Sequence, residues 1–329
     1  MDQAGLLSAV EDEAEATALR SERARRIADL VRAATGRRWV GVYDVRDEEV
    51  VNLAWSGPAA PAFLRFPTDR GLTAAAIAAA ETVVSNDVTR DPRYLVALDS
   101  TGSEMIVPVI LEGRVVGTLD VEDERTGAFS DDDRETLEGV AERMRTLYTW
   151  HVRPADPDRD AARCLEIYEP YVRDTAVSFE DPAPTLEEFQ ARMRSYIATH
   201  QWLVIESPDG HVAGYAYACP HRTRAAYRWA VDVAIYIDPA HQGAGLGRRL
   251  YAELFERLRR QGFQVACAGI NLPNDASIRL HQSMGFEPVG IYRRIGWKAG
   301  AWRDVHWWQL ELIPATDERP PEPRPPGAD

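Results

Sequence analysis

The chain has 329 residues, is 45% hydrophobic and carries a formal net charge of −14. This length and composition predict a globular protein of about two domains, and the acidic charge argues against a nucleic-acid partner. No apolar run is long enough to span a membrane, and the acidic start of the chain is unlike a signal peptide, so we expect a cytoplasmic protein. The three cysteines are far apart, which predicts reduced thiols and no bound metal.

The first 150 residues are predicted to form a helix, a hairpin, a helix, a second hairpin and a closing helix. Turn residues at 46–48 and 112–113 indicate the two hairpins. This order predicts an antiparallel sheet with flanking helices, in an α+β chain whose first domain covers 1–150. The other expected elements are a helix over 11–35 that ends at Gly36, a helix over 71–81, a strand over 82–88 and a helix over 130–150 with Ser130 as its N-cap.

The second domain is expected to cover 151–314 and to begin with a short strand and a helix. In its centre, the stretch "WAVDVAIYIDP" (229–239) alternates: Val231, Val233, Ile235 and Ile237 face one side, and Asp232, Ala234 and Tyr236 the other. A helix over 246–261 follows, with leucine at every fourth position and Gly262 as its stop. The proline-rich residues 315–329 are expected to form a disordered tail.

A glycine-rich stretch, "HQGAGLGRRL" (241–250), joins this strand to this helix. Backbone N–H groups and the helix dipole bind phosphate at such a junction. A dinucleotide fingerprint would need glycine in place of Arg248, and a P-loop would need a G-K-[S/T] sequence, which is missing. Residues Gln242 to Gly247 match the motif Q-x-x-G-x-G, and this segment resembles the loop that binds the coenzyme A pyrophosphate in GNAT acetyltransferases.

The sequence from 270 to 312, "INLPNDASIRLHQSMGFEPVGIYRRIGWKAGAWRDVHWWQLEL", resembles the end of a GNAT domain in the branch of phosphinothricin N-acetyltransferase. "TAVSFEDP", "VAGYAYACP" and "TRAAYRWAVD" are similar to the same branch, so the resemblance covers about 152–312. It implies a mixed, mostly antiparallel sheet with helices on both faces. It also implies an N-acetyltransferase that uses acetyl-CoA and a small-molecule amine of the amino-acid type.

The resemblance also implies a donor site. A backbone N–H of Val233 or Ile235 would bind the thioester carbonyl. Asn274 matches a cofactor-binding asparagine, although it also suits an N-cap. The expected cofactor-binding residues are Ala234, Ile235 and Tyr236 along the pantetheine arm, Gln242, Gly243, Ala244, Gly245, Leu246 and Gly247 at the pyrophosphate, and Asn274 and Ser277 on the next helix.

Two residues are candidates for the proton transfers. Asp232 stands where the family has a glutamate, and its side chain is one methylene shorter. It would act as the base directly or through a water, or it is only a partly solvated carboxylate on the strand. His281 shares a helix face with Ser277 and fits either proton role, or only a bond to the backbone. Near the acceptor, the resemblance implies roles for Phe179, Glu180, Arg224 and Tyr227; the guanidinium of Arg224 suits an amino-acid carboxylate, or is a solvated loop charge.

Residues 25–144 resemble a GAF domain. The resemblance is carried by the segments "DRGLTAAAIAAAETVVSNDV" and "SEMIVPVILEGRVVGTLDVEDERTGAFSDDDRETLEGVA". Among GAF domains they are similar to the free methionine-(R)-sulfoxide reductases, which work through cysteines. Here the first cysteine is Cys164 and Thr73 stands at a thiol position, which excludes thiol reduction. Asp99, Glu104 and Asp120 match ligand-contacting positions, or are surface carboxylates.

The combined expectation is an acetyl-CoA-dependent N-acetyltransferase that acts on phosphinothricin or a methionine sulfone or sulfoximine, modulated by a small effector in the GAF domain. Two alternatives are an acetyl-CoA sensor with little turnover and a protein N-acetyltransferase. The helices at 11–35 and 130–150 would suit a GAF-style homodimer.

Overall fold

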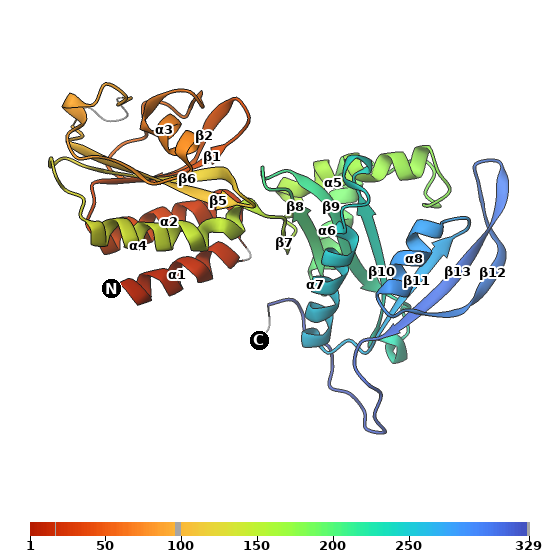
Figure 1. The fold of residues 1–329 in the computed structure, drawn as a ribbon. Helices are drawn as coiled ribbons and strands as arrows, with labels where there is room; N and C mark the ends of the chain where they lie inside the picture. The colour runs from red at the N-terminus through yellow and green to blue at the C-terminus, as the bar shows by residue number, and fades with distance from the viewer. Residues whose placement is uncertain (17, 96–99, 328–329) are drawn as a thin grey trace. The chain divides into compact units, whose positions relative to one another are not determined.

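The structure of the chain is a computed structural model that describes residues 1–16, 18–95 and 100–327 (Figure 1). It divides into two compact units. The first is Met1–His151 with Pro208–Gly210, and the second is Val152–Ser207 with His211–Asp329. The domain limits at 150 and 314 are kept as predictions.

The first unit is built on a six-stranded antiparallel sheet, in the order β3-β2-β1-β6-β5-β4, as predicted. Its second hairpin turns through Glu112 and Gly113, which both have positive φ, the conformation of a tight two-residue turn. The strands are β1 (Trp39–Val45), β2 (Glu49–Ser56), β3 (Arg65–Pro67), β4 (Val83–Ser85), β5 (Ser103–Leu111) and β6 (Arg114–Asp123).

Helices cover both faces of this sheet (Figure 1). α2 (Arg20–Thr35) and α4 (Asp131–Arg143) bury apolar side chains against one face, with α1 (Gln3–Glu15) packed on them, and α3 (Gly71–Ala79) packs on the other face. Ser130 caps α4 as predicted, since its Oγ accepts a hydrogen bond from the Asp133 N–H at 3.2 Å.

Three predicted element limits in this unit are wrong. The single helix over 11–35 is two helices, because Ala16 and Leu19 adopt extended backbone and α1 folds back to bury its own apolar face on α2 and α4. The strand predicted over 82–88 ends at Ser85, and a 3-10 turn, Val88–Arg90, follows it. The helix over 130–150 ends at Arg143 and continues as a 3-10 turn, Met144–Tyr148.

The second unit is built on a seven-stranded mixed sheet, in the order β12-β13-β11-β10-β9-β8-β7. The β10–β11 pair is parallel, whereas β10–β9 and β11–β13 are antiparallel, which confirms the predicted mixed sheet. The strands are β7 (His151–Pro154), β8 (Trp202–Glu206), β9 (Val212–Pro220), β10 (Ala230–Ile237), β11 (Val265–Asn271), β12 (Glu287–Lys298) and β13 (Ala301–Glu311).

α5 (Pro157–Arg173) and α6 (Leu186–Ile197) pack on one face of this sheet, and α7 (Leu246–Gln261) packs on the other. α7 buries the predicted leucine stripe and ends at Gly262 in the left-handed conformation. α8 (Asp275–Ser283) follows β11, and the 3-10 turns Ala225–Tyr227 and Pro239–His241 flank β10. Within the described residues, no helix combines the length and the apolar composition that crossing a bilayer requires.

Residues 315–327 form no helix or strand, yet they contact the second unit. The Trp229 indole N–H donates to the Pro321 carbonyl at 2.7 Å, and the backbone N–H of Arg324 donates to the Gln261 carbonyl at 2.8 Å. Arg228 forms an ion pair with Glu322 at 2.7 Å. The predicted disorder of this tail stays a prediction.

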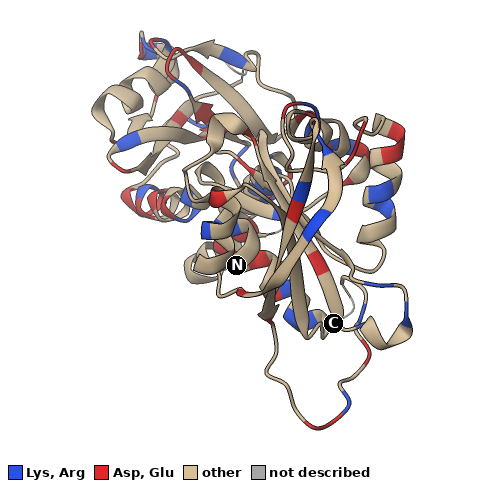
Figure 2. Cartoon of the chain, turned by 90° about the vertical axis from the view of Figure 1, so that its right-hand side faces the viewer, with Lys and Arg blue, Asp and Glu red and all other residues tan. Residues whose placement is uncertain are grey.

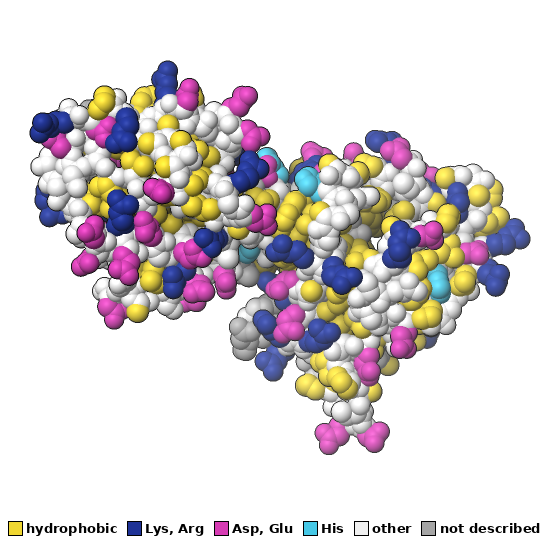
Figure 3. All heavy atoms as spheres, viewed as in Figure 1, with side chains coloured by type: hydrophobic (Ala, Val, Ile, Leu, Met, Phe, Trp, Pro, Cys, Tyr) yellow, Lys and Arg dark blue, Asp and Glu magenta, His cyan; other side chains and the backbone are white. Residues whose placement is uncertain are grey.

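Charged side chains of both signs are spread over the molecule. Basic and acidic residues are interspersed along the chain in Figure 2, and the face of the molecule seen in Figure 3 shows no continuous basic patch.

Arg153 on β7 links the first strand of the second unit to α5 and β8. Its guanidinium bonds Asp160 at 2.6 and 2.8 Å and Glu206 at 2.7 and 2.9 Å, and all three side chains are 2% exposed. Removing this cation would leave Asp160 buried without an ion pair and Glu206 with only Arg159 at 3.6 Å, which is strongly unfavourable.

We therefore expect Arg153→Met to lower the free energy of unfolding of the second unit by about 3–5 kcal/mol in a urea titration. Arg173→Met is the matched control, because Arg173 pairs with Asp174 at the exposed end of α5, and it should leave the midpoint unchanged. Equal midpoints for the Arg153 variant and the unmodified chain would refute a structural role for this buried group.

Candidate functional site

A cleft opens in the second sheet because β10 and β11 pair over only three residues. The pairing runs from Ala230 opposite Val265 to Asp232 opposite Cys267. Beyond Asp232 the two strands border a narrow cavity of about 70 Å³, which contains the predicted residues Ala234, Ile235 and Tyr236 on one wall. In the described structure, β10 thus has no strand partner on this side after Asp232, so its backbone groups are available to a ligand.

The glycine loop borders a larger groove of about 790 Å³ next to this cleft. Gly243 and Gly245 have φ values of +83° and +76°, and a Cβ added at either would meet nothing within 4 Å. α7 begins at Leu246 with no side-chain cap, so the N–H groups of its first turn face a ligand-sized space. This is the geometry of an anion site. Of the predicted loop residues, Gln242, Gly243, Gly245, Leu246 and Gly247 line the groove, and Ala244 does not.

Two contacts hold the loop in place. The Gln242 amide donates to the Tyr171 hydroxyl at 2.9 Å, and this hydroxyl donates to the Ile237 carbonyl at 2.5 Å. A Cβ on Gly247 would lie 3.1 Å from the Leu280 side chain, so this glycine lets α7 and α8 approach beside the groove.

Arg248 and Arg279 also line the groove, and the sequence prediction missed both as site residues. Neither forms an ion pair with another described residue, so their guanidinium groups are available to phosphate. Arg248 directly follows the glycine loop, which was a usable signal, whereas Arg279 reaches the groove only because α8 folds against α7.

Asn274 caps α8, and its Oδ1 accepts from the Ser277 N–H at 3.1 Å. Both side chains line the cleft and the groove, so the capping role and a place at the ligand site coexist.

His281 is 3% exposed and both of its ring nitrogens are engaged. Nδ1 donates to the Ser277 carbonyl at 2.8 Å, because a carbonyl can only accept, and Nε2 therefore accepts from the Tyr251 hydroxyl at 3.1 Å. Burial lowers the pKa of His281, which favours the neutral ring. Tyr251 is fully buried, and the sequence did not reveal its position on the wall of the cleft or its bond to His281.

Asp232 is the last residue of β10 that pairs with β11, and its Oδ1 is 2.6 Å from Nδ1 of His221. Burial raises the pKa of Asp232, while the bond to His221 opposes this rise. Within the described residues, Nε2 of His221 has no hydrogen-bond partner. The sequence prediction missed His221, because its meeting with Asp232 depends on the register of β9 against β10.

The four predicted acceptor residues lie on different elements. Tyr227 packs against the His221 ring at 5.8 Å between centroids, and Arg224 is exposed on the same loop; both line a groove of about 700 Å³. Glu180 pairs with Arg192 of α6 at 2.7 Å, and Phe179 packs on Gly296 of β12. The structure thus places Tyr227 beside His221, the partner of Asp232, whereas Glu180 contacts α6 and Phe179 contacts β12.

The first unit contains a separate cluster of buried acids. Glu104 and Glu122 are opposite each other on β5 and β6, and Asp120 is two residues before Glu122 on the same face. All three are at most 6% exposed, and one Asp120 oxygen has no hydrogen-bond partner among the described residues. They border a small cavity with Tyr43 and Thr73.

Burial raises the pKa of Asp120 to about 8, that of Glu122 to about 7, and that of Glu104 well above its usual value. Among the described residues, no basic side chain contributes to the pKa shift of any of the three acids. Glu122 was missed, although its alternation with Asp120 was visible in the sequence. The predicted ligand residue Asp99 lies outside the described residues.

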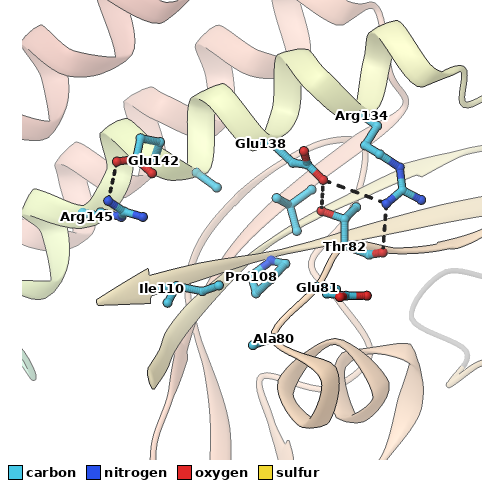
Figure 4. Close-up of a pocket in the computed structure, with 11 residues that line it drawn as sticks. Ala80, Glu81, Thr82, Pro108, Ile110, Arg134, Glu138, Glu142 and Arg145 are labelled. Atoms are coloured by element: carbon cyan, nitrogen blue, oxygen red, sulfur yellow. Dashed lines mark hydrogen bonds and ion pairs between the residues drawn. The ribbon is translucent and has the colours of Figure 1, made fainter. Parts of the chain in front are cut away.

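A second groove of the first unit, of about 390 Å³, runs between α4 and β5 (Figure 4). Its polar groups pair with one another: Arg134 donates to the Thr82 carbonyl, the Thr82 hydroxyl bonds Glu138, and Arg145 bonds Glu142. We therefore assign no ligand to it.

Comparisons with known proteins identify both units. The family model of the acetyltransferase (GNAT) domain matches residues 156–307, and that of the GAF domain matches residues 20–146.

Two curated relatives match the second unit. Phosphinothricin N-acetyltransferase of Streptomyces viridochromogenes is 38% identical over 174 residues, which cover 53% of this chain and 91% of the relative. L-methionine sulfoximine/L-methionine sulfone acetyltransferase of Salmonella typhimurium is 36% identical over 153 residues, which cover 46% of this chain and 90% of the relative.

A similar solved structure is a GNAT superfamily phosphinothricin acetyltransferase from Sinorhizobium meliloti, in complex with AcCoA. It is 32% identical, with a TM-score of 0.52, and the match covers 55% of this chain and 97% of that chain. This chain therefore belongs to the GNAT acetyltransferase family, in the branch of the phosphinothricin N-acetyltransferases, and is an N-acetyltransferase with a fused GAF domain.

Proposed function

We propose that the second unit transfers the acetyl group of acetyl-CoA to the amine of a small amino-acid-like acceptor, of the phosphinothricin or methionine sulfone and sulfoximine type. The observation that carries this proposal is the open edge of β10 after Asp232, which joins the glycine-loop groove on one side and the His221–Asp232 pair on the other. The names of the two curated relatives support the acceptor class.

The donor fits the groove through backbone and arginine contacts. Gly243 and Gly245 leave open space over the N-terminus of α7, and Arg248 and Arg279 add two cations for phosphate. The pantetheine arm would follow β10 from Tyr236 towards Asp232, where the free strand N–H groups meet the thioester carbonyl. When bound, acetyl-CoA supplies the carbonyl carbon that the amine attacks.

Asp232 acts through His221 in this proposal. An aspartate is shorter than the glutamate of the family, and its carboxylate already holds Nδ1 of the imidazole at 2.6 Å. Such a carboxylate fixes the tautomer of a histidine and stabilises the imidazolium that forms when Nε2 takes a proton. Nε2 of His221 is therefore the atom that receives the proton of the acceptor amine.

His281 and Tyr251 serve the leaving thiol. In His281 the ring proton is on Nδ1 and is donated to the Ser277 carbonyl, so Nε2 accepts from the Tyr251 hydroxyl and orients it. Both residues line the cleft, and the Tyr251 hydroxyl carries the proton that the departing sulfur would take.

The first unit is proposed to bind a small ammonium-bearing effector that modulates acetyl transfer. Glu104, Asp120 and Glu122 are buried together, no described residue pairs them with a cation, and a bound organic ammonium would supply a positive charge. Homodimer formation and cytoplasmic localisation remain predictions from the sequence.

The full chain should release thiol from acetyl-CoA in a panel of small amines, with phosphinothricin or methionine sulfone or sulfoximine as the preferred acceptor. His221→Gln should lower kcat/KM by about 10²- to 10⁴-fold and leave the KM for acetyl-CoA unchanged. Adding Asp232→Asn should cost little more, because the two residues act as a unit. Binding of acetyl-CoA without turnover would support the sensor alternative, and turnover of peptides alone would support protein acetylation.

Gly245→Val should raise the KM for acetyl-CoA more than tenfold, because a side chain at a left-handed position strains and blocks the phosphate loop. Gly113→Val is the matched control: its φ of +79° imposes a similar strain, about 1–2 kcal/mol, but it lies in a hairpin of the first unit. Similar KM values for the two variants would contradict the role of the loop.

The melting temperature of the first unit should fall as the pH rises from about 4 to about 8. The buried acids have raised pKa values in the folded state, so they stabilise the fold while protonated and lose this contribution as the pH passes about 7 to 8. Asp120→Asn should flatten the fall, whereas Asp47→Asn, at an exposed position, should not.

At pH 8, methionine sulfoxide or a related amino acid should raise the melting temperature of the unmodified chain more than that of Asp120→Asn. No shift with any amino acid would leave the unit as a scaffold.

A further inference from the structure

Three side chains with different donor atoms converge at the acceptor end of the cleft. A ring nitrogen of His221, a carboxylate oxygen of Asp232 and Sγ of Cys267 all lie within 4.8 Å of one another. In the part of the chain that the structure describes, this is the one group of three or more histidine, cysteine or acidic residues whose donor atoms lie this close. All three residues are half-buried.

The register of three strands creates the cluster. Asp232 on β10 is directly opposite Cys219 on β9 and Cys267 on β11. Opposed residues of neighbouring strands point to the same face of a sheet, and His221 follows Cys219 by two residues, so its side chain reaches the same face. The ligands are distant in sequence, which is why the cysteine spacing predicted no metal.

The donor set suits a thiophilic divalent cation. Zinc binds imidazole nitrogen and carboxylate oxygen at about 2.0–2.2 Å and thiolate sulfur at about 2.3 Å, in tetrahedral sites. These bonds place the donor atoms roughly 3.3–3.6 Å apart, so side-chain adjustments of about 1 Å would close the site. Sulfur and nitrogen donors disfavour magnesium and calcium, which prefer oxygen.

We propose that His221, Asp232 and Cys267 form a binding site for zinc or a similar cation, and that this cation inhibits acetyl transfer. The cation would take the place of the hydrogen between His221 and Asp232, and its fourth position would face the acceptor side. Binding releases the proton of the Cys267 thiol, while the imidazole proton moves from Nδ1 to Nε2, so His221 binds as a neutral ligand and can no longer accept a proton from the amine. The inhibition rests on the proposed function of His221, but the binding does not.

Cobalt is the probe for binding, because a thiolate ligand gives Co²⁺ a sulfur-to-metal absorption band that oxygen and nitrogen ligands lack. The reduced full chain should bind one equivalent of Co²⁺ with this band, and Zn²⁺ should remove it. Cys267→Ser and His221→Gln should each weaken Zn²⁺ binding more than tenfold in calorimetry, and Cys267→Ser should also lose the band. Cys164→Ala is the matched control, because this cysteine is buried in α5, and it should keep both properties.

Activity provides the second readout. Zn²⁺ should inhibit acetyl transfer by the unmodified chain, a chelator should restore it, and Cys267→Ser should keep its activity while resisting Zn²⁺ at least tenfold better. A chain without the cobalt band, or a band that survives Cys267→Ser, overturns the site. Equal Zn²⁺ inhibition of the variant overturns its role in inhibition. If no acceptor is acetylated at all, the proposed function fails while the cobalt titration still decides the binding.

Discussion

The early end of the pairing between β10 and β11 is the constraint on which the active site depends. Two neighbouring parallel strands would normally satisfy each other's backbone groups along their length. Here the pairing stops at Asp232 and Cys267, so β10 presents unpaired backbone to the cleft. The same point in the sheet holds the carboxylate that bonds His221. In the proposed function, one feature of strand geometry therefore brings the donor and the acceptor together.

The glycine loop depends on this feature in turn. β10 continues past the opening to Ile237. The Ile237 carbonyl accepts a hydrogen bond from the Tyr171 hydroxyl, and the same hydroxyl accepts one from the Gln242 amide. The loop thus begins at a strand end that these hydrogen bonds hold, and it leads into α7, which has no side-chain cap. The first N–H groups of α7 therefore face the groove next to the cleft. Gly247 allows α8 to lie close beside α7, and α8 brings Asn274, Ser277 and Arg279 to the same groove.

Both units are proposed to handle an ammonium group, by different means. In the first unit, no described residue supplies a cation to the three buried carboxylates, so burial raises their pKa values, and the proposed cationic ligand would stabilise their charged forms. In the second unit, one carboxylate is coupled to an imidazole, which gives a group that can take a proton from a bound amine and release it again. An acidic cage suits binding, and a carboxylate–imidazole pair suits turnover.

Local sequence patterns predicted much of this architecture. The alternation in 229–239, the glycines of 241–250 and the leucine stripe of α7 are signals within one element, and the structure confirms the elements they predicted. Long-range contacts were not predictable. The pairing of His221 with Asp232 needs the register of two strands, and the bond between Tyr251 and His281 needs the packing of two helices. The break between α1 and α2 was missed for a similar reason, because burial of α1 on α2 and α4 outweighs the continuous helical pattern of the sequence.

A structure of the full chain with a bisubstrate analogue, in which the sulfur of coenzyme A is linked to the amine nitrogen of methionine sulfone, tests the central claim most directly. We predict that the pantetheine arm lies along Ala234–Tyr236 in the opening between β10 and β11, and that the amine nitrogen lies about 2.6–3.2 Å from Nε2 of His221. A pantetheine arm outside this opening, or an amine nitrogen that contacts Asp232 while His221 points away, would contradict it.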